Sequence, residues 1–157
     1  MIPLPPKAPR KRVETDIVRE ILVGVNAIAG VRAARNNVGT IEDVRGIPVT
    51  FGLGEGSPDI VGVISFGGVE STISSLRRMR PFAIAFGIEV KQPKRYATPK
   101  QKAWHAVARR RGFSTCVARS DHEAVDFVHK LRLELVASMR AIVAEMGDAP
   151  VALRVRA

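Results

Sequence analysis

The segment PFAIAFGIEVK, residues 81–91, predicts a strand that ends in a charged pair. Its apolar, partly β-branched run is bounded by proline at either end, which is typical of a strand. Because side chains alternate between the two faces of a strand, Ile88 and Val90 are expected on one face and Glu89 and Lys91 on the other. We therefore expect an acid and a lysine to be presented together, either at an exposed sheet edge or in a cleft.

The flanking sequence predicts a mixed α/β domain. Periodic apolar residues over 14–28 predict an amphipathic helix, and DIVGVISF, residues 59–66, predicts a strand. Thr98, followed by proline and then by Gln101 at the third helical position, predicts the start of a helix that runs to Arg111. The other expected elements are a strand over 30–37, a brief hairpin within 38–58, a strand over 113–120 and a long helix from Ser120 to about Met146. This order, α-β-β-β-α-β with an extra long C-terminal helix, predicts a central mixed sheet flanked by helices.

Length and composition predict one compact domain. The chain has 157 residues, of which 46% are hydrophobic, enough for a single core. We expect a flexible basic arm over residues 1–12, the domain over 13–147 and a tail over 148–157. The polar and basic segment GGVESTISSLRRMR, residues 67–80, is interpreted as an inserted hairpin or short helix that is either a DNA-contacting loop or a soluble connection.

The cysteine content and hydropathy favour a cytoplasmic protein without a membrane partner. Cys116 is the only cysteine, so an intrachain disulfide is excluded, which is consistent with a reducing compartment. No apolar run approaches the ~18 residues of a membrane span, and the N-terminus lacks the apolar stretch of a signal peptide. We expect a bacterial protein, or a phage protein in a bacterial host.

The net charge of +10 favours a polyanionic partner such as nucleic acid or an anionic membrane surface. The positive charge is concentrated over residues 90–111, which contain no acid. A solvated helix face is the alternative explanation of such a segment. The absence of acids favours phosphate binding instead. The cations are Lys91, Lys94, Arg95, Lys100, Lys102, Arg109, Arg110 and Arg111.

A second acid is placed to meet Glu89. Asp59 lies in the turn GSPD, residues 56–59, which leads into the preceding strand. If the two strands pair, both carboxylates converge, and such a pair is stabilised by a shared proton or by a bound cation. Mg²⁺ prefers an all-oxygen site with a few carboxylates, the remaining ligands being water or phosphate oxygens. Such a metal activates water for attack on a phosphodiester, and Lys91 beside it is suited to orient the nucleophile.

These motifs, in this order, resemble a known nuclease family. The order is Glu14, RNN (35–37), GSPD (56–59), IEVK (88–91), TPKQKAW (98–104) and a final glycine. It is similar to the virus-type replication-repair (VRR-NUC) branch of the PD-(D/E)XK nucleases over about residues 14–125. The stretch between the two acids is longer than the family usually shows, because of the 67–80 insertion, and this puts substrate choice in doubt more than chemistry.

The resemblance implies a Mg²⁺-dependent site, in which Mn²⁺ substitutes. Asp59 and Glu89 are then the metal ligands, assisted by the carbonyl oxygen of Val90, and Lys91 serves the hydrolytic water. Glu14 resembles the helix-borne acid of the family, which reaches the metal directly or through water. Glu20 is the competing candidate for that role.

Gln101 matches the motif glutamine of the family, but its position in a capping box explains it without catalysis, and the two roles are compatible. Trp104 is interpreted as a packing residue of its helix. His105 is expected at the surface or facing DNA, and Asn36 in a turn. No Cys/His cluster, Walker-type glycine loop or Ser-His-Asp pattern is present, so neither zinc nor an organic cofactor is expected.

The sequence thus predicts a metal-dependent DNA endonuclease, specific for branched DNA such as four-way (Holliday) junctions, and acting as a homodimer through its last helix. The alternatives are a basic DNA-binding module without catalysis, and the same chemistry on flap DNA, duplex DNA or RNA. The expected nucleic-acid contacts are Arg35, Arg77, Arg78, Lys94, Arg95, Lys100 and Lys102.

Overall fold

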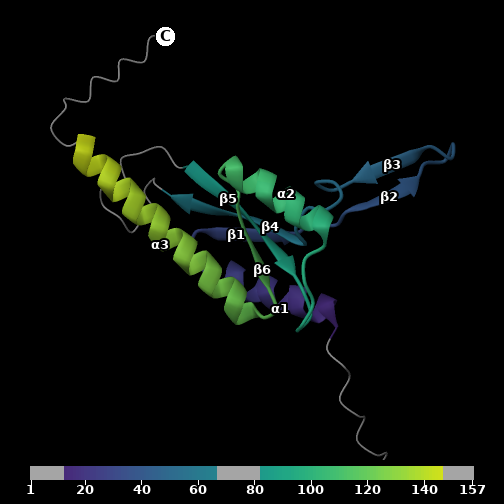
Figure 1. Cartoon of the computed structure of the whole chain (residues 1–157), viewed down its shortest axis with the longest axis horizontal. Helices are drawn as coiled ribbons and strands as arrows, with labels where there is room; N and C mark the ends of the chain where they lie inside the picture. Colours follow the sequence, from purple (N-terminus) through teal and green to yellow (C-terminus); the bar gives the residue numbers. More distant parts are fainter. Residues whose placement is uncertain (1–12, 67–81, 147–157) are drawn as a thin grey trace, which may run out of the picture.

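A computed structural model describes residues 13–66 and 82–146 as an α/β unit with a mixed central sheet, flanking helices and a C-terminal helix (Figure 1). The expected fold class is therefore confirmed at this level. The expected arm, the C-terminal tail and the insertion with Arg77 and Arg78 lie outside the described residues. The elements are α1 (Glu14–Asn26), β1 (Val31–Arg35), β2 (Gly39–Glu42), β3 (Pro48–Phe51), β4 (Ile60–Phe66), β5 (Phe82–Val90), α2 (Pro99–Arg110), β6 (Ser114–Ala118) and α3 (Asp121–Met146).

The four-stranded sheet has the order β1-β4-β5-β6, so β5 lies in its interior. The pairs β1·β4 and β4·β5 are antiparallel, and β5·β6 is parallel. Ile60 pairs with Ile88 at the end of the β4·β5 ladder. Asp59 precedes Ile60 and Glu89 follows Ile88, so the register places the two acids opposite each other. The pairing of these two strands, on which the predicted convergence of the two carboxylates depends, is confirmed.

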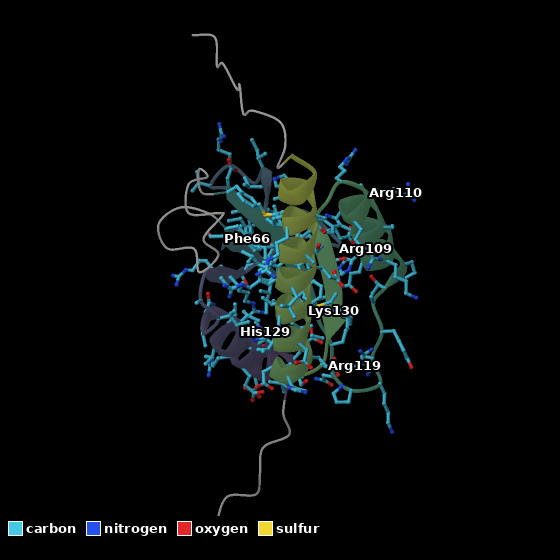
Figure 2. The ribbon with its side chains drawn as sticks, turned by 90° about the vertical axis from the view of Figure 1, so that its left-hand side faces the viewer. Phe66, Arg109, Arg110, Arg119, His129 and Lys130 are labelled. Atoms are coloured by element: carbon cyan, nitrogen blue, oxygen red, sulfur yellow. The ribbon has the colours of Figure 1, made fainter. Side chains whose placement is uncertain are left out.

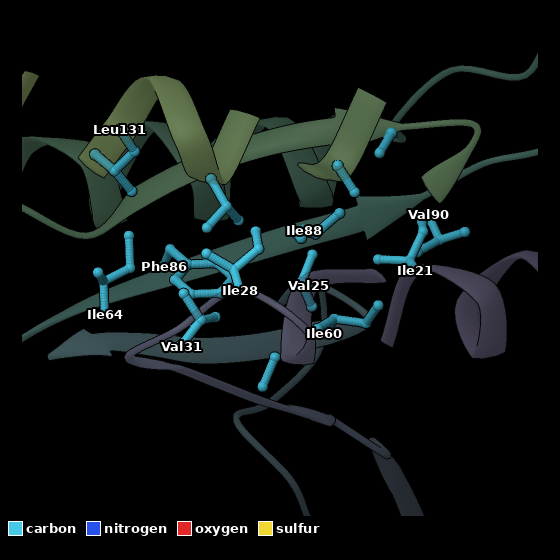
Figure 3. Packing of buried hydrophobic residues seen from close by; sticks show 14 of the residues in the cluster. Ile21, Val25, Ile28, Val31, Ile60, Ile64, Phe86, Ile88, Val90 and Leu131 are labelled. Carbon is cyan, nitrogen blue, oxygen red and sulfur yellow. The ribbon is translucent and has the colours of Figure 1, made fainter. Parts of the chain in front are cut away.

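Helices α1 and α3 cover one face of the sheet and form the hydrophobic core with it. Ile88 and Val90 of β5 are buried in this core and lie between the two helices in Figure 3. The apolar stripe of α1 is buried as its periodicity predicts. The buried side chains of the helices include Ile17, Val18, Ile21 and Val25 of α1, and Ala124, Val128 and Leu131 of α3.

Helix α2 and the GSPD turn cover the opposite face of β5. A Cβ atom at Gly87 would come within 2.5 Å of the Pro58 ring and 2.9 Å of the Phe113 ring, so only glycine admits this close approach. Trp104 packs edge-to-face on Phe113, with ring centroids 5.6 Å apart, which confirms its interpretation as a packing residue. The side chains of Glu89 and Lys91 therefore lie on the α2 face, away from the main core.

The helix ends follow local hydrogen bonds. Helix α1 ends at Asn26, two residues before the expected end, because the Asn26 side chain accepts from Ala33 N–H and donates to Ala33 C=O, which connects the helix to β1. The predicted capping box of α2 is confirmed: Thr98 N–H donates to Gln101 Oε1 (2.8 Å), and Gln101 N–H donates to Thr98 Oγ1 (3.3 Å). At α3, Glu123 N–H donates to Ser120 Oγ (3.1 Å) as expected.

Strands β2 and β3 form a separate two-stranded hairpin (Figure 1). Apolar side chains of the hairpin are exposed, among them Ile41, Val44, Ile47, Val49 and Phe51. In α3, by contrast, the apolar stripe packs against the core of its own chain as far as Met139. Among the residues described, no helix is long and apolar enough to cross a membrane.

Candidate active site

The GSPD turn is fixed in place by Asn36, which follows β1. The Asn36 side-chain amide donates to Ser57 Oγ (2.8 Å) and to Pro58 C=O (2.9 Å), and its backbone N–H donates to Asp59 C=O (2.8 Å). Gly56 has a φ of +87°, and a Cβ there would lie 2.9 Å from Lys100 C=O, so the turn also contacts the start of α2. Asn36 thus lies in the connection after β1, not in a turn of its own, and it positions the backbone that carries Asp59.

The carboxyl groups of Asp59 and Glu89 lie on the same side of the sheet. Asp59 Oδ2 accepts a hydrogen bond from Val90 N–H at 2.8 Å, which orients this half-buried carboxylate toward the end of β5. Glu89 is fully buried, with 0% of its surface exposed. Its Oε2 has no hydrogen-bond donor among the described residues.

Two donors meet the other oxygen of Glu89. Lys91 Nζ and Gln101 Nε2 both donate to Glu89 Oε1, and Lys91 Nζ also donates to Val90 C=O at 3.1 Å. Gln101 makes two contacts: its oxygen caps α2, as predicted, and its nitrogen donates to the acid on β5, while its catalytic role stays a prediction. The structure brings together Asp59, Glu89, Lys91 and Gln101 from three separate segments of the chain.

Burial raises the pKa of Glu89 to about 7, against an ordinary value of 4.5. The hydrogen bond and charge of Lys91 act in the opposite direction. The facing Asp59 carboxyl raises the pKa further, through its negative charge and through a hydrogen bond that exists only when one of the two acids is protonated. The pair therefore binds a proton near neutral pH in the absence of another cation.

Lys91 stays a cation in this environment. Burial alone would lower its pKa, but the hydrogen bond and charge of Glu89, followed by the charges of Asp59 and Glu14, raise the pKa above its ordinary value. Glu14, at the start of α1, thus acts electrostatically on the site. Glu14 is half-buried whereas Glu20 is exposed, which favours Glu14 of the two candidates.

The residues fit a divalent cation through the Asp59–Glu89 pair. Glu89 Oε2 is a buried carboxyl oxygen without a donor among the described residues, and a second carboxyl group lies opposite it, an environment that a proton or a metal ion stabilises. Within residues 13–66 and 82–146, no group of three or more His, Cys, Asp and Glu side chains is arranged to hold a metal ion. The structure therefore brings together two of the three predicted acids, and a role for Glu14 as a ligand stays a prediction.

The predicted nucleic-acid contacts differ in their surroundings. Arg35, Lys94, Arg95 and Lys102 have exposed side chains. Lys100 is also exposed, but its Nζ pairs with Glu55 Oε1 at 2.6 Å, a contact that links α2 to the loop before the GSPD turn.

The expectation for His105 is wrong, because this side chain is only 3% exposed. His105 follows Gln101 by four residues, one helical turn, so both side chains lie on the face of α2 that covers the sheet. The spacing from Gln101 was the signal that placed it there. Arg119, just after β6, was not predicted as a site residue: the sequence shows a cation at the end of an expected strand, but the pairing that brings this end beside Lys91 is visible only in the structure.

Comparison of the chain with protein-family models, with curated proteins and with solved structures found no match.

Proposed function

We propose that the chain is a divalent-metal-dependent nuclease of the PD-(D/E)XK type that hydrolyses phosphodiester bonds in DNA. The observation that carries the proposal is the buried Glu89 carboxylate facing Asp59, with Lys91 and Gln101 donating to its other oxygen. The element order α1-β1-β4-β5-α2-β6 supports the resemblance of this arrangement to the VRR-NUC branch.

Asp59 and Glu89 are the residues that would hold Mg²⁺, together with the carbonyl oxygen of Val90. The bound metal supplies a Lewis acid and lowers the pKa of a coordinated water. Lys91 Nζ lies beside Glu89 Oε1 and Val90 C=O, so the ammonium group can neutralise the acid. The same ammonium group is suited to orient an attacking water and to stabilise the charge that develops on the phosphate.

Gln101 and the Val90 N–H group have a positioning role. Each donates to one carboxylate of the pair, and each belongs to an element fixed by the fold. These hydrogen bonds hold the two carboxyl groups close together in the folded chain, although two carboxylates repel each other. The unfolded chain does not maintain this arrangement. The positive charge of exposed side chains favours association with a polyanion, and the predicted contacts Arg35, Lys94, Arg95 and Lys102 are all exposed.

The substrate proposed is branched DNA such as a four-way junction, cut by a homodimer, because two cuts at a fixed separation require two sites. The apolar stripe of α3 packs on its own core, whereas the β2–β3 hairpin exposes apolar side chains. The hairpin therefore supports a dimer contact better than α3 does. Sedimentation velocity of Val44→Asp, a change at a side chain that contacts no core residue, tests this contact: a dimer that persists unchanged argues against it.

The test of the proposal is a cleavage assay on a four-way junction, a flap, a plain duplex and a single strand, with Mg²⁺ and with EDTA. Asp59→Asn and Glu89→Gln are expected to lower the rate at least a hundredfold, since each removes a carboxylate that would hold the metal ion. Glu134→Gln, at an exposed acid of α3, is the matched control and is expected to cleave at the wild-type rate. Activity that survives Asp59→Asn refutes the site.

Two alternatives are separated by the same assay. A basic DNA-binding module without catalysis predicts salt-dependent binding and no cutting with any metal. RNA cleavage at the same acid pair predicts that RNA, supplied in competition with DNA of the same sequence, is cut faster.

A further inference from the structure

A basic pocket lies between α2 and β6, next to the acid pair. We use the term basic pocket for the cavity of about 200 Å³ that is lined by Tyr96, Lys102, His105, Arg109, Val117 and Arg119, among others. Its lining contains three cationic side chains and no acid. Figure 2 shows Arg109 and Arg119 on the same side of α3.

One buried group in this lining lacks a partner. His105 is 3% exposed, and its Nε2 has no hydrogen-bond partner in the described part of the chain. Leaving a buried polar atom unpaired costs about 1–3 kcal/mol, so such an atom in a pocket wall indicates a ligand group. A neutral imidazole with its proton on Nε2 donates one hydrogen bond to an anion.

The three cations of the pocket come from two parts of the chain and differ in their contacts. Arg119 is oriented by two contacts: its Nη2 donates to Arg95 C=O at 3.0 Å, and its guanidinium lies over the Tyr96 ring, 5.9 Å from the centroid. Lys102 and Arg109 are exposed on α2, seven residues apart and therefore on the same face of the helix. Three cations and one neutral donor thus line a cavity that is large enough to admit a phosphate group.

From this arrangement we propose that the basic pocket binds a phosphate group of the nucleic-acid strand, adjacent to the phosphate that is cleaved. The inference rests on the proposed function for the identity of the ligand. A tetrahedral phosphate offers several acceptor oxygens, which matches donors that approach from α2 and from the end of β6. The pocket is close to the reacting centre, because Val117 of its lining pairs with Glu89 in the β5·β6 ladder.

The first experiment uses inorganic phosphate without metal, in the Asp59→Asn variant, so that its result is independent of cleavage. The chain has three histidines, and His122 and His129 are exposed on α3, where they serve as internal controls. Added phosphate is expected to shift the ring ¹⁵N signals of His105 saturably and to leave the other two unchanged. Equal shifts at all three histidines, or none, overturn the proposal.

The second experiment compares neighbouring arginines. Arg109→Ala and Arg119→Gln are expected to weaken phosphate binding about tenfold each, as the loss of one charge-assisted hydrogen bond predicts. Arg110→Ala, on the same helix but outside the pocket lining, is expected to change it less than twofold. If Arg110→Ala weakens binding as much as Arg109→Ala does, the effect is general charge and the pocket is refuted.

A third comparison identifies the source of the phosphate. A short single strand with a 5′-phosphate and the same strand without it are titrated against the Asp59→Asn variant. Equal affinities assign the pocket to an internal diester, and tighter binding of the phosphorylated strand assigns it to a terminal group. In either case the affinity must fall in Arg109→Ala relative to Arg110→Ala, and no difference between these variants overturns the proposal. Loss of cleavage in Asp59→Asn is scored separately, so failure of the nuclease and failure of the pocket are distinguishable.

Discussion

Glu89→Gln is expected to stabilise the metal-free fold at neutral and alkaline pH while it abolishes cleavage. The substituted amide keeps an oxygen that accepts from Lys91 and Gln101. Its NH₂ group takes the place of Oε2, which has no donor among the described residues, in a side chain that lies opposite Asp59 at the end of the β4·β5 ladder. The substitution therefore replaces a repulsive carboxylate pair with an amide–carboxylate hydrogen bond.

The magnitude follows from the pKa of Glu89. Between the ordinary value of 4.5 and about 7, the folded chain binds a proton that the unfolded chain has released. Stability must therefore fall as the pH rises through this window, by up to about 1.4 kcal/mol per pH unit. Over the whole window the ceiling is roughly 3 kcal/mol, a figure that already includes the favourable contact of Lys91 with the ionised acid.

The assay is urea denaturation in EDTA at pH 5, 6, 7 and 8, for the wild type and for Glu89→Gln. The difference between the two unfolding free energies isolates Glu89, because all other titrating groups are shared. The difference is expected to move in favour of Glu89→Gln by about 1–3 kcal/mol between pH 5 and pH 8. A difference that is independent of pH, or that moves in favour of the wild type, refutes the burial and charge repulsion assigned to this acid.

Three further predictions concern the surroundings of the site. Asn36→Ala removes the side-chain hydrogen bonds to Ser57 and Pro58, so the free energy of unfolding in urea is expected to fall by about 2 kcal/mol. Cleavage is expected to slow with little loss of DNA affinity, and unchanged cleavage argues against the positioning role of Asn36. Gly56→Ala places a Cβ atom on a residue with a φ of +87°, 2.9 Å from Lys100 C=O, so the free energy of unfolding is expected to fall by about 1–3 kcal/mol. Thermal unfolding measures this change, and an unchanged stability contradicts the close approach. Burial raises the pKa of Cys116 to about 12, so Ellman's reagent is expected to label it at pH 8 only after unfolding, and fast labelling of the native chain contradicts its burial.

The fold could be predicted from the sequence wherever local signals, such as capping residues, agreed with the spacing of the hydrophobic residues. The nine residues of β5, the capping box at Thr98 and the apolar stripe of α1 each specify an element without reference to the rest of the chain. The pairing of Glu89 with Asp59 was predicted because the two strands that carry these acids are successive and apolar, so they were expected to be neighbours in one sheet.

What the sequence did not predict depends on tertiary contacts. The burial of His105 results from the way α2 lies on β5 and β6; its spacing of four residues from Gln101 indicates which face of the helix it shares, but not that this face is buried. The place of Arg119 depends on the parallel pairing of β5 with β6, which brings the end of β6 beside residues 95 and 96. The end of α1 at Asn26 is likewise set by hydrogen bonds to β1.

The central claim is that Asp59 and Glu89 together bind one divalent cation, and isothermal titration of the chain with Mn²⁺ tests it most directly. The account predicts binding in the wild type and in Glu134→Gln, with release of protons at pH 7 because Glu89 gives up its proton, and at least tenfold weaker binding in Asp59→Asn and Glu89→Gln. Binding of equal strength in all four proteins, or no binding in any of them, would contradict it.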